Sequence, residues 1–335
     1  MYIIVEIGQA HEGSLGIAHS YIDALAGTGV DAIKWQMHIA DAESSEEEPF
    51  RVKFSYEDDR RIDYWRRMEF TLEQWRGIKQ HCEEKGMEFI CSPFSNAAVE
   101  ALEQLGVSKY KIGSGEVNNF LMLEKICKTG KAVLLSSGMS SYEELQEAVN
   151  FVQSHGNELI LFQCTTAYPT EAKDWGLNVI SELREKFKLS IGFSDHSGGI
   201  TACTAAAALG ASYFEIHVVF DKRMFGPDTK ASLTIDETKD LCRSLHEVET
   251  ALNHPIEKSD NSRFTEVKGI FEKSLAVNRN MKAGEIISIE DLEGKKPKGF
   301  GLDASKFRSI IGEKLNKDLK AWSFLKEEDI SNGQA

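Results

Sequence analysis

The sequence predicts a (β/α)8 TIM barrel followed by a small β-rich domain. Short apolar, β-branched runs alternate with amphipathic stretches about eight times, which is typical of a parallel barrel. The chain of 335 residues is long enough for such a barrel and one appended unit. An open doubly wound sheet is the alternative, but the segment 7–13 after the first strand lacks a G-x-G-x-x-G phosphate turn.

Each barrel strand is predicted from an apolar run that ends in polar or turn residues. In chain order these runs are 2–6, 32–36, 87–92, 110–112, 132–136, 159–163, 189–193 and 213–218. Helices are predicted where apolar residues recur with a helical period, over 17–26, 72–85, 97–105, 141–154, 201–209 and 236–252. The barrel domain is therefore expected to span residues 1–255.

One connection is longer than the others. The stretch 41–70 carries runs of glutamate and arginine between the second strand and the next helix. Long loops at this end of a barrel often form a lid or a wall of the active site. A solvated insertion is the other interpretation of these charges.

The C-terminal part has a different pattern. Residues 256–271 are polar and are predicted to form a linker, and residues 272–335 are predicted to form a compact β-rich domain. A strand is expected at 274–277, a turn followed by a strand within 281–287, and short helical turns at 289–292 and 305–311. This domain is too small to hold a large core, so we expect it to pack on its own barrel or on a second subunit.

Composition excludes several classes of partner. The net charge of −14 argues against nucleic acid and against an anionic membrane surface. No stretch is long and apolar enough to span a bilayer, and the first residues form a strand rather than a signal peptide. The six cysteines are scattered without a CxxC pair, which is typical of reduced core residues. A cytoplasmic protein is therefore expected.

Polar side chains gather where the predicted strands end. Because the carboxyl ends of parallel barrel strands meet at one mouth, these side chains should converge. Lys34 and Lys111, together with serines and glycine turns, could bind a phosphate. His196 and His217 close the seventh and eighth strands and could hold one metal ion. Each residue alone could be a satisfied polar group, but burying so many charged groups for stability alone is unfavourable.

Seven short motifs resemble those of the sialic acid synthase family, which comprises the N-acetylneuraminate, legionaminate and pseudaminate synthases. In order they are VEIGQAHEGS (5–14), IKWQ (33–36), SPFS (92–95), YKIGSGE (110–116), LSSGM (135–139), FSDHS (193–197) and GPDTKAS (226–232). The C-terminal unit resembles the antifreeze-like (SAF) domain that follows the barrel in that family. The resemblance covers nearly the whole chain.

This resemblance implies a reaction and a set of partners. The family condenses phosphoenolpyruvate with the aldehyde carbon of an N-acyl hexosamine, giving a nine-carbon 2-keto-3-deoxy acid and phosphate. It uses a divalent metal, with Mn²⁺ expected here and Mg²⁺ or Co²⁺ as alternatives. In the family the SAF domain of one subunit reaches over the barrel of the other, which implies a domain-swapped homodimer.

The resemblance also implies site residues. His196 and His217 would hold the metal, and Glu6, Gln36, Lys111 and Asp228 would form the catalytic set. The expected substrate-binding residues are Lys34, Ser92, Ser114, Glu116, Ser136, Thr166, Tyr168, Ser194 and Lys296.

Two departures from the family's motifs leave the identity of the sugar substrate undecided. The family has a K-R-P-G motif whose arginine contacts the N-acyl group, and this chain has Lys296 in that place. Lysine lacks the planar fork of donors that arginine supplies. Thr166 also stands where some relatives have asparagine. A synthase for another aldose, of the octulosonate type, and a non-catalytic saccharide- or ice-binding protein are the alternative functions.

Overall fold

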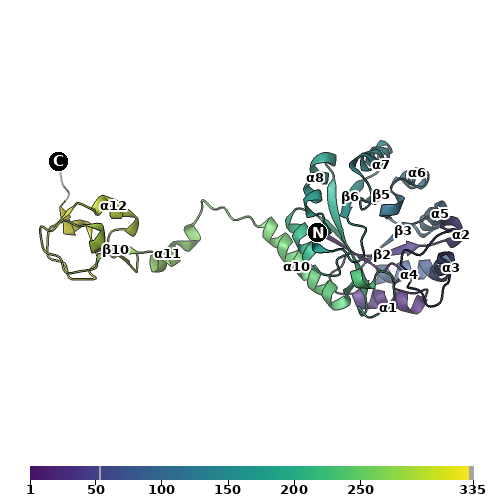
Figure 1. Cartoon of the computed structure of the whole chain (residues 1–335), viewed down its shortest axis with the longest axis horizontal. Coiled ribbons are helices and arrows are strands. Elements are labelled where there is room, and N and C mark those ends of the chain that lie inside the picture. Colours follow the sequence, from purple (N-terminus) through teal and green to yellow (C-terminus); the bar gives the residue numbers. More distant parts are fainter. Residues whose placement is uncertain (53, 332–335) are drawn as a thin grey trace. The chain divides into compact units, whose positions relative to one another are not determined.

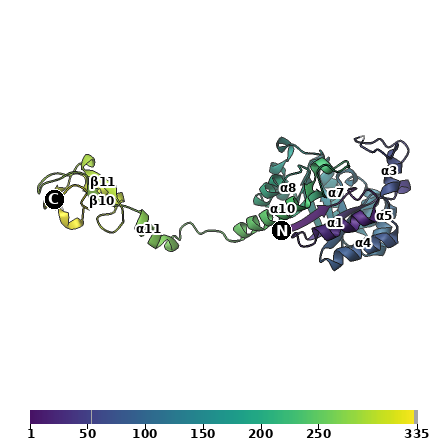
Figure 2. The same ribbon diagram turned by 90° about the horizontal axis from the view of Figure 1, so that it is seen from below.

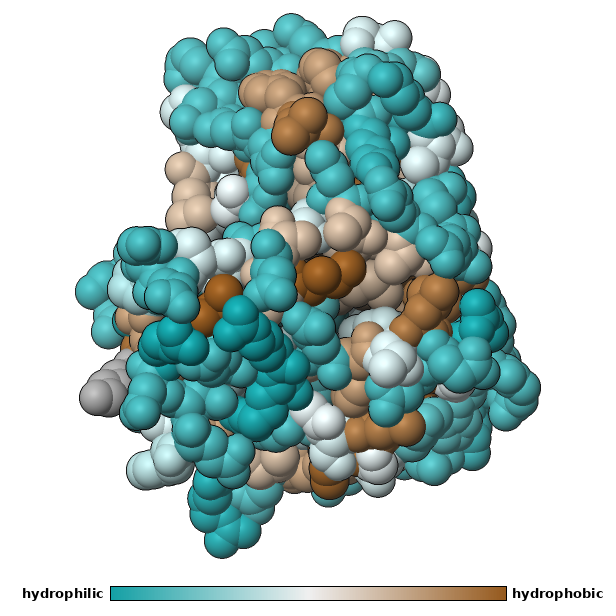
Figure 3. Space-filling view, turned by 90° about the vertical axis from the view of Figure 1, so that its right-hand side faces the viewer, coloured by the Kyte–Doolittle hydropathy of each residue, from teal (hydrophilic) through white to brown (hydrophobic). Residues whose placement is uncertain are grey.

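The structure is a computed structural model that describes residues 1–52 and 54–331. The chain forms two compact units, Met1–His254 and Pro255–Ala335. Residues 332–335 of the expected C-terminal domain lie outside the described residues. In the described part, no helix has the length and apolar character needed to cross a membrane. Figure 3 shows hydrophobic side chains as small separate patches among hydrophilic ones.

The first unit is a closed parallel barrel, which confirms the predicted fold. Each strand pairs with the next in the sequence, and the last pairs back with the first. The strands are β1 (Tyr2–Glu6), β2 (Ala32–Met37), β3 (Glu88–Pro93), β4 (Lys109–Ile112), β5 (Ala132–Ser136), β6 (Leu159–Cys164), β7 (Ser190–Asp195) and β8 (Tyr213–Val219). A short strand, β9 (Leu233–Thr234), pairs in parallel with the last residues of β8.

Helices surround these strands in both views (Figure 1, Figure 2). Several begin at side-chain caps, and Thr71 and Ser141 form capping boxes with Gln74 and Glu144. The helices are α1 (Leu15–Leu25), α4 (Leu72–Glu84), α5 (Asn96–Leu105), α6 (Phe120–Cys127), α7 (Tyr142–Ser154), α8 (Leu177–Phe187), α9 (Thr201–Ala208) and α10 (Ile235–Asn253).

Strand alternation decides which side chains face the barrel interior. On β8, Phe214 and Ile216 join the core beneath the helices, whereas Glu215 and His217 line the interior cavity. An apolar cluster fills the N-terminal end of the interior: Ile4, Ala32, Ile90, Leu134, Ile160 and Phe162. The polar residues that follow on the same inward faces are therefore left at the C-terminal mouth.

The charged stretch after β2 folds over this mouth. It contains α2 (Ala40–Glu43) and α3 (Arg61–Met68), and its own apolar cluster holds it together. The cluster consists of Ala40, Ile62, Tyr64, Trp65 and Met68, with Phe50 and Phe54 packed against it. Several residues of the stretch line the cavity, so the structure favours the wall interpretation over a purely solvated insertion.

The second unit contains two small antiparallel sheets. In these sheets β10 (Ser274–Val277) pairs with β11 (Leu292–Lys295), and β12 (Lys314–Leu315) pairs with β13 (Ile330–Ser331). The short helices are η4 (Ser262–Phe264), α11 (Thr265–Phe271), η5 (Ile289–Asp291), η6 (Ala304–Lys306), α12 (Phe307–Ile310) and η7 (Glu327–Asp329).

Within the segment 281–287 the expected turn is present, and the backbone turns at Gly284 with a φ of +87°. The strand expected after this turn is wrong, because only an isolated bridge from Ile286 to Lys314 forms there.

Candidate active site

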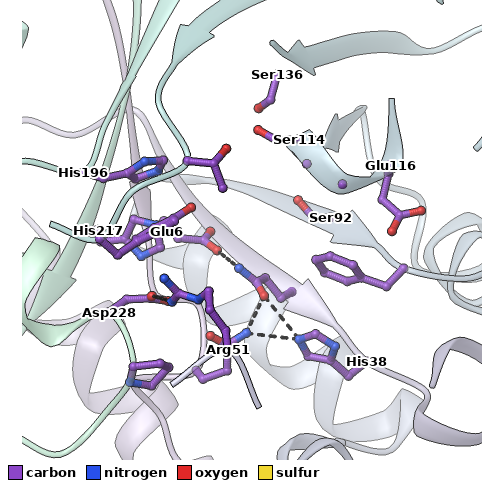
Figure 4. A pocket seen from close by; sticks show the side chains of 18 of the residues that line it. Glu6, His38, Arg51, Ser92, Ser114, Glu116, Ser136, His196, His217 and Asp228 are labelled. Atoms are coloured by element: carbon purple, nitrogen blue, oxygen red, sulfur yellow. Dashed lines mark hydrogen bonds and ion pairs between the residues drawn. The ribbon is translucent and has the colours of Figure 1, made fainter. Parts of the chain in front are cut away.

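The strand ends meet around one cavity of about 430 Å³ at the mouth of the barrel (Figure 4). This volume is in the range of small-molecule sites. The cavity brings together side chains from all of the barrel strands. The expected site residues that line it are Glu6, Lys34, Gln36, Ser92, Lys111, Ser114, Glu116, Ser136, Thr166, Tyr168, Ser194, His196, His217 and Asp228.

Two buried lysines and two buried carboxylates form the floor of the cavity. The Nζ of Lys34 lies 2.7 Å from Oε2 of Glu6 and 3.7 Å from Oε1 of Glu215. The Nζ of Lys111 lies 3.5 Å from Oε2 of Glu215. Buried charges need partners, and here the chain supplies its own counter-ions. An anionic ligand would therefore compete with Glu6 and Glu215 for the two ammonium groups.

Lys34 and Glu215 favour each other's charged form. Burial alone would raise the pKa of Glu215, but the charges of Lys111 and Lys34 outweigh it and hold that pKa below its usual range. Burial also opposes the charge of Lys34, and Glu215 and Glu6 overcome it, so the pKa of Lys34 is raised. At neutral pH the floor carries both ammonium and carboxylate charges.

Hydroxyl groups surround the lysines. Lys111 donates to the hydroxyl of Ser136, and the Nζ of Lys34 donates to Oγ of Ser92 at 3.3 Å. Gly138 keeps open the space beside Ser114, because a Cβ there would lie 2.6 Å from the Ser114 Oγ and 2.5 Å from the Thr166 Oγ1. Point charges, hydroxyl donors and a bare backbone are a donor set suited to phosphate.

His196 and His217 lie next to each other, with ring centroids 5.4 Å apart. The Nδ1 of His196 lies 2.8 Å from the backbone oxygen of Thr165, so that nitrogen donates and Nε2 keeps its lone pair. Burial, followed by the charge of His217, lowers the pKa of His196 to about 3. The His196 ring is therefore neutral at physiological pH, as a metal ligand must be.

The histidine pair fits a divalent metal that keeps open positions. Within residues 1–52 and 54–331, no group of three or more His, Cys, Asp or Glu side chains is arranged to hold an ion. A metal here would have two imidazole ligands and would take its remaining ligands from water or from substrate oxygens. Open coordination of this kind is typical of catalytic rather than structural sites.

The outer wall combines three loops. The Nη2 of Arg51, from the stretch after β2, donates to Oδ1 of Asp228 at 2.8 Å. The same guanidinium lies 4.5 Å from the ring centroid of Tyr168, and that ring stacks on His196 at 4.1 Å. Arg51 therefore covers the side of the cavity that holds the histidine pair. Burial, followed by the charge of Asp228, raises the pKa of Tyr168, so its hydroxyl stays protonated.

Glu215, Arg51 and His38 are among the cavity residues that sequence reasoning missed. Glu215 carried a usable signal, because it precedes His217 by two residues on one strand and so shares its inward face. Arg51 and His38 lie within or just before the long charged stretch, where no periodic pattern sets the direction of a side chain.

Lys296 belongs to the second unit, where its Nζ lies 4.8 Å from the ring centroid of Phe271. It is the expected site residue that the structure does not place in the barrel. Its role at the cavity stays a prediction.

Comparisons with known proteins agree on one family. The model of the NeuB family matches residues 21–257. An N,N'-diacetyllegionaminic acid synthase from Campylobacter jejuni is 33% identical over 331 residues, covering 97% of this chain and 98% of that protein. A pseudaminic acid synthase from Campylobacter jejuni is 33% identical over 334 residues, covering 98% and 96%.

A solved structure is similar as well. The crystal structure of an N-acetylneuraminic acid synthetase from Leptospira borgpetersenii, in complex with citrate, superimposes with a TM-score of 0.71 at 28% identity. The superposition covers 80% of this chain and 90% of that one.

Proposed function

Since this chain belongs to the NeuB family, we propose that it is a sialic-acid-type synthase that condenses phosphoenolpyruvate with an N-acyl hexosamine. The products would be a nine-carbon 2-keto-3-deoxy acid and phosphate. The observation that carries this proposal is the convergence of two lysines and two histidines on one cavity. The lysines suit an anionic donor, and the histidines suit a metal beside the acceptor.

Phosphoenolpyruvate would bind in the inner part of the cavity. Its carboxylate and phosphate would draw Lys34 and Lys111 away from Glu6 and Glu215. Ser92, Ser114, Ser136 and Ser194 lie around these lysines and would donate to the phosphate oxygens. Because both lysines are already buried beside the cavity, only their side chains would shift from the carboxylates to the anion.

His196 and His217 would hold the divalent metal, with Mn²⁺ expected and Mg²⁺ or Co²⁺ as alternatives. When bound there, the ion would supply a Lewis acid for the aldehyde oxygen of the sugar. The enol carbon then attacks the aldehyde carbon, and positive charge develops at the carbon that bears phosphate. Water adds at that carbon, and phosphate leaves from the resulting tetrahedral intermediate.

Glu6 would orient that water and accept its proton. It lies at the end of β1, and its two oxygens contact the side chains of Lys34 and Gln36. Displacement of Lys34 toward the donor anion would free one oxygen of Glu6 for the water. The lysines stabilise the negative charge of the donor and of the departing phosphate.

The open-chain sugar would lie along the outer wall. Asp228 and Glu116 offer carboxylates for its hydroxyls, and Thr166 and Tyr168 complete this part of the cavity. Burial raises the pKa of Glu116. N-acetylmannosamine and N-acylated diamino hexoses both fit the chemistry of this wall.

The second unit would act as a SAF domain. In a domain-swapped homodimer it would bring Lys296 to the cavity of the partner subunit. The six cysteines are free and buried, which supports a reducing, cytoplasmic location.

The test of the function is a sugar panel with product mass spectrometry. The full-length protein is mixed with phosphoenolpyruvate, Mn²⁺ and either N-acetylmannosamine, an N-acylated diamino hexose or arabinose 5-phosphate. The proposal predicts phosphate release and a nine-carbon acid with an N-acyl sugar. Turnover with arabinose 5-phosphate alone would instead identify an octulosonate-type synthase. Saccharide binding without any phosphate release would identify a non-catalytic protein.

A further inference from the structure

We propose that His38 and Glu43 are positioning residues for Glu6, and that they act through the side-chain amides of Gln9 and Gln36. The inference rests on the proposed function for its kinetic test, whereas its geometry does not depend on the reaction. The four residues line the same cavity as Glu6. Dashed lines lead from Glu6 to His38 in Figure 4.

The first link is the amide of Gln36. Its Nε2 donates to Oε1 of Glu6 at 2.5 Å. An amide that was rotated by half a turn would instead present its oxygen to the carboxylate, and the contact would be repulsive. The position of Glu6 therefore depends on what holds the oxygen end of Gln36.

One donor, the amide of Gln9, holds that end. Gln9 donates from its Nε2 to Oε1 of Gln36, and Nε2 of His38 lies 3.2 Å from the same oxygen. The Nε2 atoms of Gln9 and His38 also lie 3.2 Å apart. An NH₂ group has two hydrogens, so Gln9 can donate to both partners if the Nε2 of His38 carries no proton.

Glu43 sets that tautomer. Its Oε1 lies 2.6 Å from Nδ1 of His38, so Nδ1 carries a proton, and in the neutral ring Nε2 then keeps its lone pair. The other oxygen of Glu43 accepts from the backbone nitrogen of Ile39 at 3.3 Å. With this tautomer, hydrogen bonds run from Glu43 through His38, Gln9 and Gln36 to Glu6. The contact between Nε2 of His38 and Oε1 of Gln36 is then a packing contact and not a hydrogen bond.

Aromatic rings lock the imidazole in place. His38 lies between Trp65 and Phe94, with centroid distances of 4.0 and 4.8 Å and nearly parallel planes. Only 4% of His38 is exposed, so the contacts with Glu43 and Gln9 form away from competing water. Trp65 and Glu43 both come from the stretch after β2, which gives that stretch a role in orienting the catalytic carboxylate.

The kinetic test uses variants that keep the shape of the site. His38→Phe keeps the stacked ring but removes both nitrogens, and it should lower kcat about tenfold with little change in either KM. Glu43→Ala should also lower kcat, whereas Glu43→Gln keeps an acceptor for Nδ1 and should restore most of the activity. Glu46→Ala, on an exposed residue of the same stretch, is the matched control and should behave as wild type.

A double-mutant cycle separates positioning from a general structural effect. If His38 acts through Gln36, His38→Phe should cause no further loss of kcat in a Gln36→Leu background. Losses that multiply, or a His38→Phe variant with wild-type kcat, would overturn the inference. Failure of the wild type to turn over any sugar would instead count against the proposed function.

A second readout does not require turnover. Nitrogen-15 NMR of the imidazole rings should show His38 protonated at Nδ1 and unprotonated at Nε2. The His38 signals are assigned by their loss in His38→Phe. In Glu43→Ala the proton should move in part to Nε2. A wild-type His38 that carries its proton at Nε2, or a tautomer that is insensitive to Glu43→Ala, would contradict the relay.

Discussion

Lys111 and Glu215 face each other inside the barrel, with Nζ and Oε2 3.5 Å apart. Oε1 of Glu215 also lies 3.7 Å from Nζ of Lys34, so one carboxylate serves both lysines. Removal of one partner from a buried charge cluster leaves the others without compensation. Glu215 is therefore expected to stabilise the empty barrel and to weaken the binding of an anionic substrate.

The variant Glu215→Gln separates these two effects. It leaves two buried ammonium groups with Glu6 alone, which should destabilise the ligand-free protein by about 3–5 kcal/mol. The same change should strengthen phosphoenolpyruvate binding, so the ligand should raise the melting temperature more than in wild type. Glu185→Gln, on the exposed face of α8, is the control and should change stability by less than about 0.5 kcal/mol. An unchanged melting temperature for Glu215→Gln would contradict the pairing.

Metal removal should abolish turnover. Treatment with a chelator should stop phosphate release, and Mn²⁺ should restore it. Calorimetry should show that His196→Ala and His217→Ala each weaken Mn²⁺ binding more than about a hundredfold. His155→Ala, at the end of α7, should bind Mn²⁺ as wild type does. Phosphate release that persists in either cavity variant would rule out the assigned metal site.

Arg51 should affect the sugar and not the donor. Its guanidinium bridges Asp228 and Tyr168 on the outer wall, away from Lys111 and its hydroxyl partners. Arg51→Ala should raise the KM of the sugar about tenfold, the effect of one lost charge-assisted hydrogen bond. The KM of phosphoenolpyruvate should stay within about twofold. Arg60→Ala removes an exposed arginine that pairs with Asp63 in the same stretch, and steady-state kinetics should show no effect. Equal changes in both KM values would refute the assignment.

His11 should make the fold sensitive to acid. Its buried ring contacts Phe70, and Nδ1 accepts from the backbone nitrogen of Gly13 at 3.0 Å. Burial, followed by the neighbouring His38 ring and the Arg67 guanidinium, lowers the pKa of His11 to about 3. In the unfolded chain His11 takes up a proton near pH 6.5, whereas in the folded protein it stays neutral down to about pH 3. The contribution of the neutral His11 ring to the free energy of unfolding is therefore complete above pH 6.5 and is lost as the pH falls toward 3.

The effect of His11 can be measured as the slope of the free energy of unfolding against pH. One such group changes the free energy of unfolding by at most about 1.4 kcal/mol per pH unit between pH 6.5 and its folded-state pKa. His11→Asn keeps an acceptor for Gly13 but does not titrate, so its free energy of unfolding should fall less steeply between about pH 6.5 and pH 4. Urea unfolding across this range measures both slopes, and equal slopes would show that His11 is not buried as a neutral ring.

The barrel could be predicted because each of its strands corresponds to a short apolar run in the sequence. The apolar runs at 2–6 and 132–136 coincide with β1 and β5. Other strand ends differ by one or two residues, because backbone pairing extends past the last apolar side chain, as at Asp195 on β7. The strand-end residues of the mouth followed from topology, because parallel strands place all their carboxyl ends together. Asp228, Thr166 and Tyr168 followed only from the family resemblance.

The pairing inside the site could not be predicted in the same way. Glu215 and Lys111 are distant in sequence, and their contact depends on the closure of the barrel through β8 and β1. The direction of Arg51 depends on the apolar cluster that folds the stretch after β2, and no local period encodes it. Within 281–287 the expected turn is present at Gly284, but the strand expected after it is only an isolated bridge at Ile286, because pairing there depends on the distant Lys314.

Crystals of the full-length protein soaked with Mn²⁺ and phosphoenolpyruvate test the central claim most directly, with the manganese located by its anomalous scattering. The account predicts one manganese ion bound by both His196 and His217, and a phosphate group held by Lys111, Ser114 and Ser136 in the same cavity. Manganese bound elsewhere, or phosphoenolpyruvate bound away from Lys34 and Lys111, would contradict it.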